Sequence, residues 1–178
     1  EHYQGRFGYM MAVPKPIIAA INGPVAFICL VFTIYCDLRF AGSDAKFTTS
    51  FAQRGLIAEH GISWLLPRLI GTAHALDLLF SARKASAAEA ERIGLVNKTF
   101  AQDAFMENVT AYARLLADTV SPRSVGVMKA QIWKSHFQGF NEAVEIGDAE
   151  MTKSFPTEDF KEGVAHFVEK RAAKFTGR

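Results

Sequence analysis

Cysteine, charge and long apolar runs are all scarce in this chain of 178 residues. Two cysteines are too few for a disulfide framework. Charged residues make up 21% of the sequence and the net charge is +2, without a Lys/Arg-rich run, which argues against a nucleic-acid surface. The strongly apolar stretch at residues 24–35 is shorter than the roughly 20 residues of a membrane-spanning helix. We therefore expect no disulfide scaffold, no nucleic-acid partner and no membrane partner.

Apolar residues are plentiful, at 49% of the chain, so a sizeable core in one domain with a helical appendage is expected. Cys29 and Cys36 lie seven residues apart, on one face of a helix, which predicts that both pack in this core. The sequence begins at Glu1 rather than Met, and no signal peptide is visible. We expect an interior fragment of a longer, cytoplasmic protein.

Strand and helix patterns alternate in the first part of the chain. Residues 17–21 are a short apolar run bounded by proline and Asn-Gly, which predicts a strand buried on both faces. The length of the stretch at 24–35 favours a helix. Residues 38–42 then predict a strand and residues 46–49 a short edge strand. The order strand, helix, strand predicts a parallel sheet, so the fold class is α/β.

Helical patterns with recognisable start signals dominate the rest. Ser86 and Glu89 form a capping box, Ser121 precedes proline as an N-cap, and Asn141 is expected to cap the following helix. Gly71 is expected to stop one helix and Gly94 another. The expected helices cover residues 62–70, 73–81, 87–93, 103–119, 122–137, a segment after 141, and 158–174, with a short terminal strand at 95–98.

A series of short motifs runs along almost the whole chain. They are Lys15-Pro16-Ile17-Ile18-Ala19-Ala20-Ile21-Asn22-Gly23, Cys36-Asp37-Leu38-Arg39-Phe40-Ala41, Ala45-Lys46-Phe47, Leu66-Pro67-Arg68-Leu69-Ile70-Gly71, Ala88-Glu89-Ala90 with Ile93-Gly94-Leu95-Val96-Asn97, and Glu162-Gly163 with Phe167-Val168-Glu169-Lys170-Arg171. No single motif is decisive. Their joint order is specific, and it resembles the crotonase family, the enoyl-CoA hydratases and isomerases.

This resemblance implies a crotonase-like spiral of ββα units followed by a helical region that builds homotrimers, often paired into hexamers. Residues 1–100 would be the C-terminal part of the spiral core and residues 101–178 the oligomerisation region. Family chains are longer at the N-terminus, and that part is expected to carry the first oxyanion-hole amide. The implied substrate is an acyl-CoA thioester; coenzyme A enters with it, so no separate cofactor and no metal are expected.

The family stabilises a thioester enolate with two backbone amides, the second from a glycine-rich turn at a helix start. By register the Cys29 N–H takes this role here, with Ala26 and Phe27 beside the substrate. Phe27, Ile28 and Cys29 stand where glycines are expected, which matters if the turn needs positive φ. A nucleophilic Cys29 is the alternative, although the sequence identifies no base for it.

Typical hydratases use two glutamates, and the corresponding positions hold Val31 and Phe51. Because water addition needs two acid/base groups, ordinary hydratase chemistry is disfavoured. Glu59 remains, in a loop at residues 55–61 that resembles the loop of the catalytic acid in Δ3,Δ2-enoyl-CoA isomerases. One carboxylate can move a proton between two carbons, so Glu59 is the candidate acid/base, with Val31, Phe51 and Trp64 as its apolar lining.

Other interpretations stay open. Glu59 is also explained as a carboxylate near a helix N-terminus, and the adjacent His60 is either a second candidate or a structural hydrogen-bonding residue. Phe167 and Lys170 match positions that contact coenzyme A in the family, but they also suit a core side chain and a solvated charge. For the whole protein the alternatives are an enoyl-CoA hydratase of fatty-acid degradation and a catalytically silent acyl-CoA-binding homologue.

Overall fold

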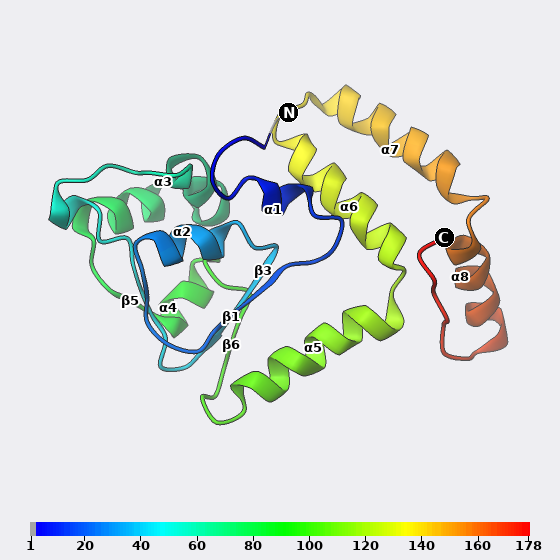
Figure 1. The fold of residues 1–178 in the computed structure, drawn as a ribbon, viewed down its shortest axis with the longest axis horizontal. Coiled ribbons are helices and arrows are strands. Elements are labelled where there is room, and N and C mark those ends of the chain that lie inside the picture. Colours follow the sequence, from blue (N-terminus) through cyan, green and yellow to red (C-terminus); the bar gives the residue numbers. More distant parts are fainter. Residues whose placement is uncertain (1–2) are drawn as a thin grey trace. The chain divides into compact units, whose positions relative to one another are not determined.

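A computed structural model describes residues 3–178, which form two compact units. The expectation that the sequence begins inside a longer protein concerns residues 1 and 2, which lie outside the described residues. The first unit runs to Met10 and continues over Ile17–Thr110. The second comprises Met11–Pro16 and Ala111–Arg178. Figure 1 colours both along the sequence, from blue to red. The division into domains at residues 100 and 101 stays a prediction.

One sheet of the first unit is entirely parallel, in the order β1-β3-β6. Its strands are β1 (Ile18–Ile21), β3 (Leu38–Gly42) and β6 (Lys98–Phe100). In the central strand, Ala41 lies opposite Ile21 on one side and Thr99 on the other. The parallel sheet predicted from the strand–helix–strand order is thereby confirmed. β1 is not buried on both faces throughout, because Ala20 is exposed.

A second sheet has the order β2-β4-β5. Its strands are β2 (Val25–Ala26), β4 (Lys46–Thr48) and β5 (Ala85–Ser86). β4 pairs in parallel with β2 and antiparallel with β5, so it is the central strand. The prediction of an edge strand here is wrong. Its two partners are only two residues long, too short to produce a periodic pattern.

The helices of the first unit are α1 (Tyr9–Ala12), α2 (Ile28–Ile34), the 3₁₀ turn η1 (Ala52–Arg54), α3 (Ile62–Ser81), α4 (Ala87–Arg92) and α5 (Phe105–Thr119), of which α1 and α5 continue into the second unit. The predicted helix at 24–35 is shorter than expected, because Phe27 has φ 59° and ψ −129° and cannot be helical. Gly71 interrupts α3 at φ 76° and ψ 159°, which confirms the break predicted there.

The two ends of α4 confirm one prediction and correct two others. The Ser86 hydroxyl accepts from the Glu89 N–H at 3.1 Å, as expected of an N-cap. The Glu89 carboxylate does not return to the cap; it binds the Arg83 guanidinium. The amides of Leu95 and Val96 donate to the Ala90 carbonyl and close the helix, so the strand begins at Lys98 rather than at 95.

The core of the first unit is built from apolar side chains of α2, β3, β4, α3 and the segments between them. The largest fully buried ones include Phe47, Phe51, Leu30, Ile34, Ile62 and Leu66. Cys36 is buried beyond the end of α2, whereas Cys29 in the first turn is exposed. The prediction that both cysteines pack in the core is therefore right only for Cys36.

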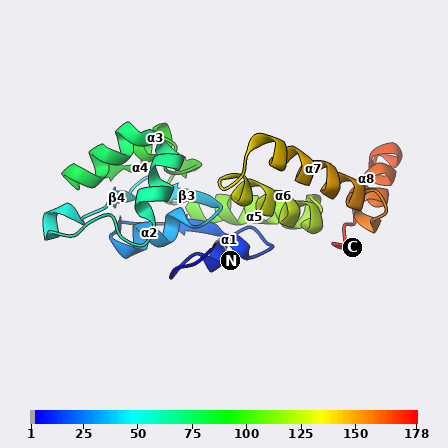
Figure 2. The same cartoon turned by 90° about the horizontal axis from the view of Figure 1, so that it is seen from above.

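The second unit contains α6 (Pro122–Ser135), α7 (Phe140–Ser154) and α8 (Glu158–Glu169). α6 and α7 pack against each other, as Figure 2 shows. Ser121 caps α6 as predicted, accepting from the Ser124 N–H. Gly139 rather than Asn141 is the N-cap of α7. α8 ends before 174, because Lys170 adopts a left-handed conformation with φ 51°.

Asp159 ties the C-terminal segment to this helical unit. Its buried carboxylate accepts from the Ser121 hydroxyl at 2.5 Å and from the backbone N–H groups of Thr176 and Gly177. Burial opposes the charge, yet these donors together hold the pKa of Asp159 below its usual value. Over residues 3–178, no helix is long and apolar enough to cross a membrane.

Candidate functional site

The turn between β2 and α2 has the backbone geometry that a glycine would normally supply. Phe27, the residue before α2, has positive φ, a conformation that costs a non-glycine residue about 1–3 kcal/mol. The Val31 N–H donates to the Phe27 carbonyl as the first bond of the helix. The Cys29 N–H precedes that bond and therefore has no acceptor within the helix. Cys29 and the neighbouring Ala26 are both exposed.

Aromatic contacts hold the Phe27 side chain in this strained turn. Its ring lies 4.9 Å from the ring of Phe51, centroid to centroid, and the Arg54 guanidinium lies 5.4 Å from its centre. Such pairs contribute about 0.5–1.5 kcal/mol beyond the area they bury, which offsets part of the backbone cost. The structure thus brings the side chains of two predicted site residues, Phe27 and Phe51, into contact.

The positions expected to hold two catalytic glutamates are occupied by buried hydrocarbon. Val31 and Phe51 both belong to the core of the first unit. Neither side chain can take or deliver a proton. Any acid/base chemistry in this unit must therefore use another group.

Glu59 lies in the loop just before α3, where its carbonyl accepts from the Ile62 N–H. Its side chain is partly buried, with 32% of its surface exposed. One carboxylate oxygen is 3.7 Å from His60 Nε2. The carboxylate is thus partly accessible, and a carboxylate in such a place can accept and return a proton.

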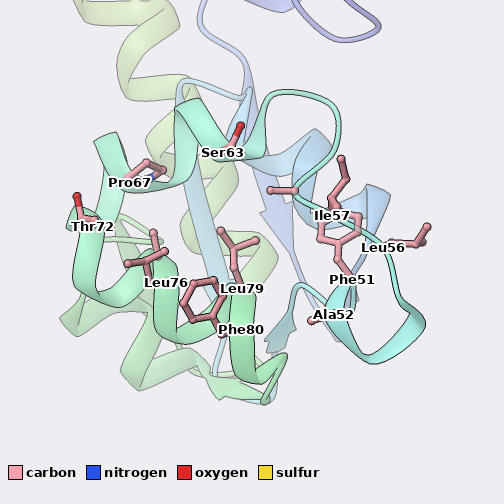
Figure 3. A pocket seen from close by; sticks show the side chains of 12 residues that line it. Phe51, Ala52, Leu56, Ile57, Ser63, Pro67, Thr72, Leu76, Leu79 and Phe80 are labelled. Atoms are coloured by element: carbon pink, nitrogen blue, oxygen red, sulfur yellow. The ribbon is translucent and has the colours of Figure 1, made fainter.

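A largely apolar pocket of about 500 Å³ opens between the segment that follows β4 and helix α3, as Figure 3 shows. It is lined by Phe51, Ala52, Leu56, Ile57, Ala58, Ser63, Pro67, Thr72, Ala75, Leu76, Leu79 and Phe80. Ala58, which precedes Glu59, and Ser63, four residues after it, are on its wall, whereas Glu59 is not among the lining residues. This volume suits a small apolar ligand or an acyl chain.

Only Phe51 among the predicted lining residues borders this pocket. Val31 faces the core, and the Trp64 ring lies under the Arg68 guanidinium at 3.9 Å instead. Sequence reasoning missed Leu76, Leu79 and Phe80. Their spacing along α3 was the available signal, but it is equally typical of a helix face that packs in a core.

Phe167 and Lys170 are placed in the second unit, whereas the other candidate residues are in the first. Phe167 is 79% exposed, so it is not a core side chain of this chain. Lys170 is exposed at the C-terminus of α8. Over residues 3–178, no group of three or more His, Cys, Asp or Glu side chains is placed to hold a metal ion.

The comparisons with known proteins agree across the whole chain. The enoyl-CoA hydratase/isomerase family model matches residues 1–178. The chain is 34% identical to the mouse enoyl-CoA hydratase domain-containing protein 2, mitochondrial, and 30% identical to the 1,2-epoxyphenylacetyl-CoA isomerase of Escherichia coli K12. These alignments cover 100% and 93% of this chain, but 61% and 63% of those proteins.

The fold matches solved structures equally well. The crystal structure of an enoyl-CoA hydratase from Bacillus anthracis superposes with a TM-score of 0.91 at 28% identity. The match covers 95% of this chain and 65% of that one. The α/β fold expected from the motifs is therefore confirmed, and the chain spans about three fifths of the length of the relatives it matches.

Proposed function

The chain belongs to the enoyl-CoA hydratase/isomerase family, and on that premise we propose that it isomerises a double bond in an enoyl-CoA thioester, with Glu59 as the single acid/base. Within the family, the Glu59 loop resembles that of Δ3,Δ2-enoyl-CoA isomerases. The observation that carries the proposal is the partly buried Glu59 carboxylate, directly after the pocket-lining residue Ala58, while Val31 and Phe51 are hydrocarbon.

Moving a double bond requires one proton to leave a carbon and one to return at another, with an enolate in between. A single carboxylate performs both transfers if the enolate is stabilised long enough. We assign one stabilising donor to the Cys29 N–H. The positive φ of Phe27 supports this assignment, because the turn keeps the backbone conformation that a glycine would adopt although it contains none. The exposed Cys29 thiol has no assigned role in this scheme.

The pocket beside the Glu59 loop is proposed to hold the acyl group. Its wall is almost entirely hydrocarbon, which favours an apolar chain over a polar one. Ala26, Phe27 and Trp64 remain candidate substrate contacts outside the lining of this pocket. Phe167 and Lys170 are proposed to contact coenzyme A from a neighbouring copy in a homotrimer or hexamer, and the exposed Phe167 ring suits an adenine. A cytoplasmic location remains a prediction.

Two other functions have specific support. The mouse relative carries hydratase in its name and the Escherichia coli relative carries isomerase, so a hydratase activity is the first alternative. The second is a catalytically silent acyl-CoA-binding homologue. The strained Phe27 favours it, because a small shift of the turn would remove the Cys29 donor, and one lost oxyanion donor costs about 10²–10³ in rate.

The test is to assay the full-length protein with a 3-enoyl-CoA and a 2-enoyl-CoA, beside Glu59→Gln and the control Glu107→Gln. Glu107 is an exposed carboxylate on α5. We expect double-bond shift in the wild type and in Glu107→Gln but not in Glu59→Gln. Hydration of the 2-enoyl-CoA that survives Glu59→Gln would establish the hydratase. Acyl-CoA binding without any turnover would establish the silent homologue.

A further inference from the structure

Tyr35 joins the helix that carries the proposed oxyanion donor to the loop that carries Glu59. It follows the last residue of α2, and only 8% of its surface is exposed. Its hydroxyl donates to the His60 carbonyl at 2.9 Å. His60 is the residue after Glu59, so this bond fixes the backbone directly beside the candidate acid/base.

Aromatic packing supports the same connection. The Phe7 ring lies 5.8 Å from the Tyr35 ring and 6.2 Å from the His60 ring, centroid to centroid. Phe7 also contacts Phe32 of α2 edge-on at 5.6 Å. One ring thus packs against the helix and the loop together, and His60 has a structural place in this cluster.

The backbone of the turn needs such support, because His60 and Gly61 both have positive φ, at 53° and 82°. A histidine is rarely left-handed without contacts that hold it there. A Cβ on Gly61 would lie 2.5 Å from the Tyr35 hydroxyl oxygen. The turn therefore fits closely around the phenol, which explains glycine at position 61.

We propose that Tyr35 is a positioning residue, whose hydroxyl holds the His60–Gly61 turn and thereby sets the place of the Glu59 carboxylate relative to the α2 amides. This inference rests on the proposed isomerase function. The enolate must meet the carboxylate and the Cys29 N–H together, and Tyr35 bonds the two elements that carry them. Burial raises the pKa of Tyr35, so the phenol stays protonated and remains a donor.

The experiment compares Tyr35→Phe with Tyr9→Phe in the full-length protein. Tyr9 is 59% exposed on α1 and serves as the matched control. We expect kcat for double-bond shift to fall about 10- to 100-fold in Tyr35→Phe, as for a displacement of about 1 Å, with KM changed less than about twofold. Amide hydrogen exchange at residues 60–62 should accelerate in Tyr35→Phe alone.

Unchanged kcat, or unchanged exchange at residues 60–62, overturns the proposal. A fall in kcat that only matches the fraction of unfolded protein, measured by circular dichroism, also overturns it. Gly61→Ala provides a second variant, since it crowds the phenol while the hydroxyl is retained, and it should also lower kcat more than it raises KM. Wild-type turnover in Glu59→Gln instead overturns the proposed function, and exchange at residues 60–62 then decides whether Tyr35 holds the turn.

Discussion

The two compact units differ sharply in what holds them together. The first has a core of fully buried apolar side chains contributed by helices and both sheets. In the second, the buried residues are the apolar Met11 and the polar Lys129 and Asp159, while large apolar side chains of α6, α7 and α8 are exposed. Phe140, for example, is 82% exposed. The first unit is thus stabilised by its own core, and the second presents the kind of surface that a partner covers.

This difference matches the proposed roles of the two units, catalysis in the first and coenzyme A binding in the second. The candidate acid/base and the apolar pocket lie in the unit with a core, where packing can hold a site to within fractions of an ångström. The unit with exposed apolar faces carries Phe167 and Lys170, the proposed coenzyme A contacts. A homotrimer or hexamer would cover those faces, and it would give contacts that one chain supplies to the next.

The largest effect is expected from removing a core side chain of the first unit. Phe47 in the central strand β4 is 1% exposed, so Phe47→Ala should lower the free energy of unfolding by about 3–5 kcal/mol. Urea denaturation monitored by circular dichroism measures the change. A decrease in the free energy of unfolding below about 1 kcal/mol would mean that core packing does not distinguish the first unit from the second.

Asp159→Asn should destabilise the second unit by about 1–3 kcal/mol, because the N–H and O–H donors around the carboxylate lose part of their acceptor. The pKa of Asp159 is lowered in the folded protein, so its contribution is complete above the unfolded value of about 3.9 and is lost as pH falls through the folded value. Thermal unfolding between pH 7 and pH 2 should show a shallower acid decline in Asp159→Asn. Identical pH profiles would refute this role.

Phe27→Gly and Phe27→Ala separate backbone strain from ring contacts. Both variants lose the contacts with Phe51 and Arg54, but only glycine adopts a φ of 59° without a steric penalty. We expect Phe27→Gly to be more stable than Phe27→Ala by about 1 kcal/mol, whereas an alanine variant is usually more stable than the glycine variant at the same position. Chemical denaturation of the two proteins side by side decides it, and a more stable Phe27→Ala would contradict the strained turn.

The smallest effect on stability is expected at the exposed Phe140. Phe140→Ala should change the free energy of unfolding at high dilution by less than about 0.5 kcal/mol. Its effect should instead appear in assembly, as a lower mass in sedimentation experiments at the same protein concentration. A mass equal to that of the wild type across the dilution series would exclude this residue from any interface.

Local signals in the sequence predicted a good part of the fold. Ser86, Ser121 and Gly71 mark helix boundaries through hydrogen bonds and backbone angles that depend on the residue itself. The strand–helix–strand order predicted the parallel sheet. The strands β2 and β5 were missed because two residues carry no periodicity. The N-cap of α7 was predicted at Asn141 instead of Gly139, because asparagine and glycine are both common at that position.

The site was less predictable, since it depends on contacts between distant segments. The order of motifs identified the family and drew attention to Glu59, but nothing in the sequence joins Tyr35 to His60, which are 25 residues apart. The sequence raised a positive φ at this turn only through the family resemblance, because a phenylalanine by itself does not indicate that geometry. Apolar periodicity also could not separate a covered helix face from an exposed one, so the contrast between the two units emerged only in three dimensions.

In the proposed reaction one carboxylate, Glu59, moves the proton. This role is tested most directly by following the full-length protein with a 3-enoyl-CoA in D₂O by NMR, beside Glu59→Gln and Glu107→Gln. We predict that wild type and Glu107→Gln shift the double bond and return part of the abstracted protium to the product, as expected of a single group that both removes and delivers it. Glu59→Gln should be slower by about 10²–10⁴. Equal rates in wild type and Glu59→Gln would contradict the account.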